Sequence, residues 1–81
     1  MIYNFLFSNS KEELERWSGE VLEFTVPAKD IDEARGLAIK KALKDGFKFV
    51  LIFVFTPEPV GLEIVDVYSE VIKAAFERWF K

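Results

Sequence analysis

Cysteine and histidine do not occur in this chain of 81 residues. Without cysteine the chain has no disulfide, no thiolate nucleophile and no cysteine-based metal site, which fits a protein of the reducing cytoplasm. Without histidine it lacks the side chain that most often serves as a general base near neutral pH, and it lacks imidazole as a metal ligand. We therefore expect a cytoplasmic protein that is not an enzyme, with no catalytic residues, no metal and no cofactor.

Glutamine is also absent, and the chain has only two asparagines and one methionine. Thermophile proteins share this scarcity of thermolabile residues, and designed proteins can show it too. We expect a thermostable chain, and a de novo design with no function beyond folding stays open as an alternative. The net charge of −3 provides no basic footprint for duplex nucleic acid. Residues 1–4 carry no cationic region ahead of an apolar core, so no signal peptide is expected.

The most apolar stretch is 47–55, in which Lys48 is the one charged residue. It is too short to cross a bilayer as a helix, which needs about 20 apolar residues. Both faces of an extended chain would be apolar here, so the pattern predicts a strand that is covered on both sides. One face has the row Phe47, Phe49, Leu51, Phe53 and Phe55, and the other has Val50, Ile52 and Val54. Residues 2–7 predict a similar inner strand, and residues 20–26 alternate as a half-buried strand does.

Two helices can be bounded from their end signals. The helix predicted over 11–18 follows Ser10, and the helix predicted over 31–45 follows Asp30; each of these residues precedes a glutamate by three positions, the spacing of a capping box. Gly46 is suited to end the second helix, because glycine adopts the left-handed conformation common at that position. Both connections should therefore be helical.

Residues 62–80 allow two interpretations. At about 100° per residue most of their apolar side chains gather on one arc, which favours a single long helix with Phe76 and Trp79 turned into the core. The alternative is a fourth strand over 62–68, followed by a shorter helix that Ser69 caps. On the single helix the polar arc, expected to be solvated rather than catalytic, carries Glu63, Asp66 and Glu70.

The order β-α-β-α-β-α predicts one α/β domain over 1–81, with a three-stranded, largely parallel sheet and helices on both faces. Because the first helix is short, the first two strands should be neighbours, which gives the strand order 2-1-3. The alternative order is β-α-β-α-β-β-α, with the fourth strand at 62–68.

A parallel sheet binds ligands beyond the carboxyl ends of its strands, where helix N-termini meet. There the chain offers an anion or nucleotide site made from Ser8, Asn9, Ser10, Lys29 and Thr56. The competing interpretation is that Ser10 and Asp30 only cap helices and that the rest is solvated loop, since no glycine-rich phosphate loop is present.

The lysines at 40, 41, 44 and 48 form a basic cluster near Phe47 and Phe49. Interleaved lysine and aromatic residues can bind single-stranded nucleic acid, which makes this a further candidate function. However, cations at a helix C-terminus also complement the helix dipole, and both phenylalanines belong to the apolar row. Nucleic acid is therefore not the expected partner.

With strand order 2-1-3 the strand 47–55 is an edge. An unpaired apolar edge is an aggregation template unless it is covered. The sequence therefore predicts a homodimer in which this edge pairs with its copy, whereas the fourth-strand alternative predicts a monomer. The predicted interface residues are Phe49, Leu51, Phe53, Trp17 and Phe80.

No specific biochemical activity can be predicted from these patterns. The class that fits best is a non-enzymatic, self-associating or protein-interaction domain, with the anion site and the lysine cluster as alternatives. A membrane partner is not expected, because the polar arc of the last helix is acidic, whereas membrane-surface helices usually carry lysine and arginine there.

Overall fold

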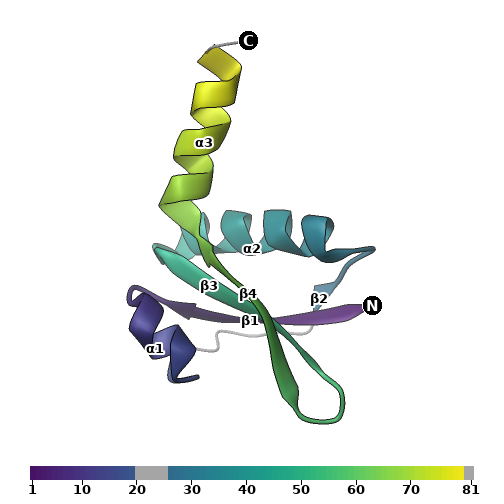
Figure 1. The fold of residues 1–81 in the computed structure, drawn as a ribbon. Coiled ribbons are helices and arrows are strands. Elements are labelled where there is room, and N and C mark those ends of the chain that lie inside the picture. Colours follow the sequence, from purple (N-terminus) through teal and green to yellow (C-terminus); the bar gives the residue numbers. More distant parts are fainter. Residues whose placement is uncertain (20–25, 80–81) are drawn as a thin grey trace.

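The computed structural model describes residues 1–19 and 26–79, which form one four-stranded sheet and three helices (Figure 1). In chain order the elements are β1 (Ile2–Ser8), α1 (Lys11–Glu15), β2 (Val26–Pro27), α2 (Ile31–Asp45), β3 (Phe49–Phe55), β4 (Pro59–Asp66) and α3 (Val67–Trp79). The strands lie in the order β2-β1-β3-β4, and each neighbouring pair is antiparallel. The predicted parallel three-stranded sheet is therefore wrong, while the element order is that of the alternative with a fourth strand.

The strand directions explain why the alternation of strands and helices was misleading. Both β2 and β3 run antiparallel to β1, which lies between them, so β2 and β3 are parallel to each other. Helix α2 joins these two parallel strands across β1, as in a split β-α-β unit. The helical crossover and the neighbour order 2-1-3 that the sequence predicts are both present. However, the second and third strands run antiparallel to the first, not parallel to it.

The segment after β3 forms a strand where the helical spacing favoured a helix. Strand β4 pairs with β3 along its length, with a register shift at which Ile52 faces Glu63 and Phe53 faces Gly61, so that Leu62 is the extra residue of a bulge. The strand ends at Asp66, and Val67 and Tyr68 already belong to α3, so the segment 62–68 weighed as a fourth strand contains residues of two elements. Pairing with β3 also satisfies the hydrogen-bonding groups that the predicted sheet left open.

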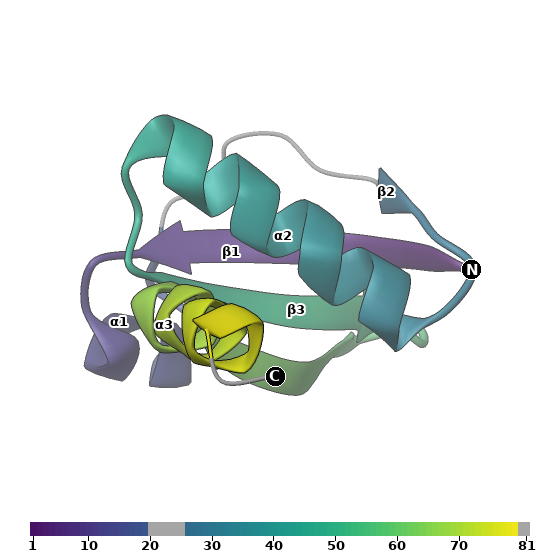
Figure 2. The ribbon, with the colours of Figure 1, turned by 90° about the horizontal axis from the view of Figure 1, so that it is seen from above.

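Two helices cover the two faces of the sheet, as the apolar rows predicted (Figures 1 and 2). On the α2 face the helix contributes three fully buried alanines, and the strands contribute large side chains: Tyr3, Phe5, Phe7, Val50, Ile52 and Val65. On the α1 face Leu14 is fully buried against Leu6, Leu51 and Phe53. Strand β3 thus lies between helical layers, with its even row on the α2 face and Leu51 and Phe53 on the other.

The end signals of the helices are confirmed in part. The Ser10 hydroxyl accepts a hydrogen bond from the Glu13 N–H (3.4 Å), and the Asp30 carboxylate accepts one from the Glu33 N–H (2.9 Å). Gly46 ends α2 with a φ of 81°. Helix α1 is shorter than predicted, ending at Glu15, and of the predicted strand 20–26 only Val26 lies within the described residues.

Candidate interaction surface

Helix α3 projects from the rest of the domain (Figure 1). As far as the structure describes it, Val67 is the one buried residue of this helix, and every residue from Val71 to Trp79 is exposed. Figure 2 looks down the axis of α3 and shows α2 lying across β1 and β3 beside it. The sheet and α2 therefore leave most of α3 uncovered.

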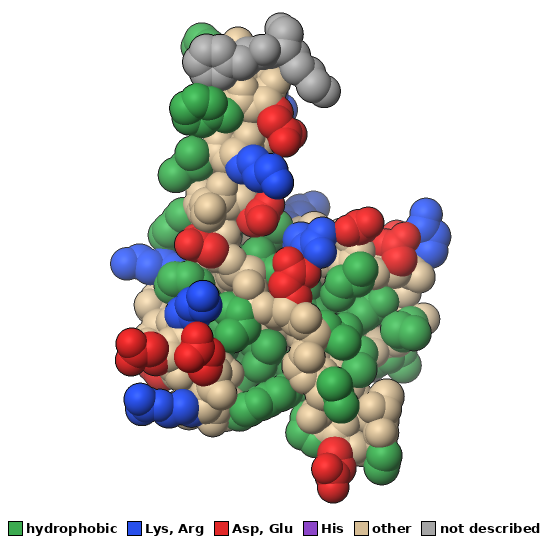
Figure 3. Space-filling model, viewed as in Figure 1, with side chains coloured by type: hydrophobic (Ala, Val, Ile, Leu, Met, Phe, Trp, Pro, Cys, Tyr) green, Lys and Arg blue, Asp and Glu red, His purple; other side chains and the backbone are tan. Residues whose placement is uncertain are grey.

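The exposed part of α3 is amphipathic. Its apolar residues share one side of the helix, and Ser69, Glu70, Lys73 and Glu77 share the opposite side. In Figure 3 the hydrophobic side chains follow the side of α3 that is turned away from α2, while charged side chains follow the other. We call the apolar side the α3 face and define it by Tyr68, Val71, Ile72, Ala75, Phe76 and Trp79.

The exposed fractions on the α3 face are large for such side chains: 46% for Tyr68, 58% for Ile72, 61% for Phe76 and 81% for Trp79. Phe76 and Trp79 were expected in the core, and that expectation is wrong. The sequence correctly indicated their common arc, but not that the arc faces away from the domain. Because amphipathic helices normally bury their apolar side, this face is the feature that most needs an explanation.

Ala75 makes the α3 face uneven. It lines a depression of about 300 Å³ together with Ile72, Phe76 and Trp79. It also lines a second depression of about 280 Å³, between Val71, Ala74 and Arg78. Between larger neighbours, a small residue leaves room for a side chain of another molecule to enter.

The base of α3 is fixed to the domain by its own backbone and by Asp66. The N–H of Val67 donates a hydrogen bond to the Lys48 carbonyl (2.9 Å) at the start of β3. The Asp66 carboxylate accepts a hydrogen bond from the Ser69 N–H (3.1 Å), as an N-cap residue does. Asp66 therefore has the capping role that the alternative gave to Ser69.

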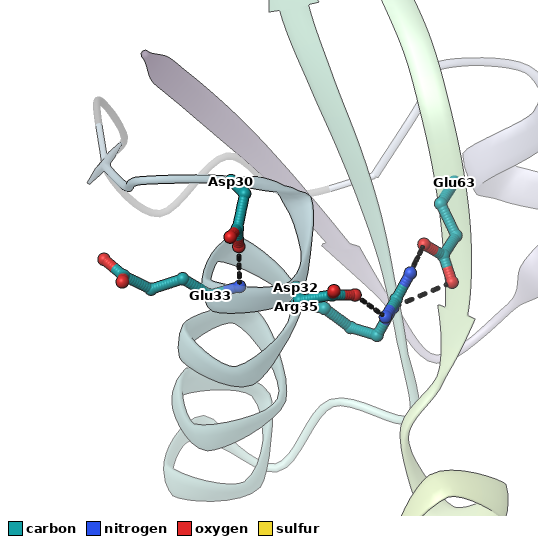
Figure 4. A network of polar contacts seen from close by, with 5 residues as sticks. All are labelled: Asp30, Asp32, Glu33, Arg35 and Glu63. Atoms are coloured by element: carbon teal, nitrogen blue, oxygen red, sulfur yellow. Dashed lines mark hydrogen bonds and ion pairs between the residues drawn. The ribbon is translucent and has the colours of Figure 1, made fainter.

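An ion-pair network holds β4, the strand before α3, to α2 (Figure 4). The Arg35 guanidinium donates to both carboxylate oxygens of Glu63, with Nη2–Oε2 at 2.7 Å and Nε 3.1 Å from each oxygen. Its Nη1 also donates to Asp32 (2.8 Å). Hydrogen bonding to Glu63 raises the pKa of Arg35 above its ordinary value. The sequence did not predict this pair, because helical spacing placed Glu63 on a solvated helix face.

The residues of the predicted anion site are divided between opposite ends of the sheet. Ser8 is the last residue of β1, where it faces Phe49 at the start of β3, and Asn9 and Ser10 follow it. Lys29 and Thr56 follow the ends of β2 and β3, at the other end. A seven-residue strand spans about 20 Å, so the antiparallel sheet separates the two groups.

The hydroxyl and amide groups of the first group already have partners. The Ser8 hydroxyl accepts a hydrogen bond from the Ser10 N–H (2.9 Å), and the Asn9 side-chain oxygen accepts one from the Lys48 N–H (2.9 Å). These contacts support the interpretation that the segment caps α1 and ties it to β3.

Three residues of the lysine cluster lie on α2, and Lys48 directly precedes β3. Lys40, Lys41 and Lys44 border an apolar groove of about 380 Å³ together with Phe5, Val26 and Leu37, and Lys41 pairs with Asp45 at 3.1 Å. The two aromatic residues proposed to stack on bases are half-buried in the cores: Phe47 packs on Phe7 with ring centroids 5.5 Å apart, and Phe49 packs on the α1 face.

The predicted dimer edge is inside the sheet. Strand β3 pairs with β1 on one side and β4 on the other, so Phe49, Leu51 and Phe53 cannot form a new edge-to-edge pair. Trp17 is 43% exposed and packs on Phe53 (ring centroids 5.2 Å apart) and near Gly61. Phe80 lies outside the described residues. The homodimer itself stays a prediction, but its predicted route is excluded.

Within residues 1–19 and 26–79 no group of three or more acidic residues could hold a metal ion. In the same part of the chain no helix has the length and apolar character needed to cross a membrane. Comparisons with protein-family models, with curated proteins and with solved structures found no match.

Proposed function

We propose that this chain is a non-enzymatic interaction domain whose binding element is α3. The observation that supports the proposal is the α3 face: a continuous apolar surface on a projecting helix, with Glu70, Lys73 and Glu77 on the opposite side and Arg78 at its margin. Groove-binding and pairing helices present their apolar residues to a partner in the same way.

The length of α3 supports the same conclusion. Helices shorter than about 12–15 residues are marginal in water unless tertiary contacts support them. Helix α3 has 13 residues, and beyond Val67 the domain gives it little cover. A partner on the α3 face would supply the missing contacts, so binding and helix stability should be coupled.

Four polar residues that the sequence offered as candidate site residues have structural roles. Glu63 is held by Arg35, Asp66 caps α3, and the hydroxyls of Ser8 and Ser10 accept backbone hydrogen bonds. These structural roles and the exposed α3 face together favour an interaction domain over an enzyme.

The exposure of Trp79 tests the proposal. The chain has two tryptophans, so Trp17→Phe leaves Trp79 as the only one, and Trp79→Phe is the matched variant that leaves Trp17. In dilute solution, acrylamide should quench Trp79, which is 81% exposed, more strongly than Trp17, which is 43% exposed and packs on Phe53. Strong shielding of Trp79 in the monomer would mean that α3 folds back onto its own domain, and the proposal would be wrong.

A further inference from the structure

We infer that the occupant of the α3 face is α3 of a second copy of this chain, packed antiparallel about a two-fold axis. This inference rests on the proposed function, because it names the partner of the same surface. It replaces the β3 edge, which is occupied, by a different route to self-association.

The spacing along the helix is compatible with an antiparallel pair. The central stripe of the α3 face is Tyr68, Ile72, Ala75 and Trp79, with steps of four, three and four residues. These steps are those of alternating core positions in a coiled coil. Because the sequence of steps reads the same in both directions, one stripe can face its own reverse with every position matched.

The two central positions, Ile72 and Ala75, are complementary in size. In this register Tyr68 lies opposite Trp79 of the second copy, and Ile72 lies opposite Ala75 of the second copy. The isoleucine then enters the depression that Ala75 leaves between its larger neighbours. A parallel pair would place alanine opposite alanine, which leaves a gap at that level.

The polar residues of α3 agree with this arrangement. Ser69, Glu70, Lys73 and Glu77 lie away from the stripe and would stay in water. Arg78 lies at the margin of the α3 face, beside Val71 and Ala75. An antiparallel pair also opposes the two helix dipoles, whereas a parallel pair aligns them. In addition, antiparallel packing brings the tip of each helix to the base of the other, instead of crowding both domains at one end.

The available area reaches the lower bound of stable dimer interfaces if the whole α3 face is covered. A fully exposed aromatic side chain contributes about 150–250 Å². With the exposed fractions of Tyr68, Val71, Ile72, Phe76 and Trp79, the α3 face presents roughly 600 Å² of apolar surface. Two copies would bury roughly 1,200 Å², the lower bound of stable interfaces, before any contact between the domains is added.

The first measurement is the mass of the intact chain by light scattering over a range of concentrations. The wild type should change from 9.4 kDa to twice that mass as concentration rises. Ile72→Gln should weaken association by at least roughly ten-fold, because the two-fold axis removes two isoleucines from the interface. Lys73→Gln places the same side chain one residue away, on the polar side, and should leave association unchanged.

Disulfide trapping tests the direction of packing. The chain contains no cysteine, so Tyr68→Cys and Trp79→Cys each introduce a single thiol. In an antiparallel pair, identical positions lie about 16 Å apart along the axis while the two different positions lie side by side. A disulfide needs Cα atoms about 4.4–6.8 Å apart. Mixing the variants should therefore give a mixed disulfide, and neither variant alone should cross-link.

Each contrary result has a distinct meaning. Cross-linking of each variant with itself would overturn the antiparallel arrangement. A dimer that Ile72→Gln does not weaken would overturn α3 as its interface. A wild type that stays at 9.4 kDa at every concentration would overturn the second copy as the partner. In that last case the quenching of Trp79 tests the proposed function separately. An exposed Trp79 would still support α3 as a binding surface for another protein, whereas a shielded Trp79 would overturn the proposed function as well.

Discussion

Replacing glycine by alanine at three positions should give three different results, because the surroundings of the glycines differ. A Cβ at Gly19 would lie 2.6 Å from the Phe7 carbonyl oxygen and 2.8 Å from a methyl carbon of Leu14. Real Cβ atoms do not approach backbone this closely, so either β1 or the segment at Gly19 would have to move. Overpacking of this kind costs about 1–3 kcal/mol.

Gly36 provides the matched control. It lies in the middle of α2, and a Cβ there would meet nothing within 4 Å. Alanine in a helix interior is more stable than glycine by roughly 0.5–1 kcal/mol, so Gly36→Ala should stabilise the domain. Gly46 has the same open surroundings but a φ of 81°, and Gly46→Ala should cost roughly 1–2 kcal/mol through backbone strain alone.

The free energy of unfolding, measured in urea, separates these effects. Gly19→Ala and Gly36→Ala should differ by about 1.5–4 kcal/mol, with opposite signs relative to the wild type. For a domain of this size, each kcal/mol corresponds to roughly 4–8 °C in Tm, so heating should show the same order. If Gly19→Ala were as stable as the wild type, Gly19 could not lie against β1 as described, and the packing of α1 on the sheet would have to be revised.

Three further substitutions test other parts of the domain. Leu14→Ala should lower the free energy of unfolding by about 2–5 kcal/mol, because Leu14 is fully buried. Glu15→Ala, at the exposed neighbouring position, should change the free energy of unfolding by less than about 0.5 kcal/mol. Equal effects of the two substitutions would contradict the core on the α1 face. A double-mutant cycle of Arg35→Met and Glu63→Gln should give a coupling free energy of about 1 kcal/mol or less, since both side chains are about one-third exposed. A coupling of several kcal/mol would contradict that exposure. Asp66→Ala should cost about 0.5–2 kcal/mol and reduce the helical circular dichroism signal, and an unchanged signal would show that Asp66 is not the cap of α3.

The sequence by itself determined the elements whose signals are local. The two apolar rows of 47–55 required cover on both faces, and β3 has it. Asp30 and Gly46 bounded α2 correctly, because a cap and a left-handed glycine act on adjacent backbone groups. The arc that joins Phe76 and Trp79 on one side of a helix was also correct, since it follows from helical periodicity.

Only the tertiary structure decided how these elements pair. Strand direction depends on which backbone groups meet across the sheet, and a pattern of side chains along one strand does not determine it. The bulge at Leu62 and the Arg35–Glu63 pair likewise depend on residues distant in sequence. Periodicity groups the apolar residues of α3 but cannot say whether the domain covers them, because burial depends on where the helix lies relative to the sheet. Helix α3 begins at the end of an edge strand and leaves the domain there, so its apolar side remains exposed.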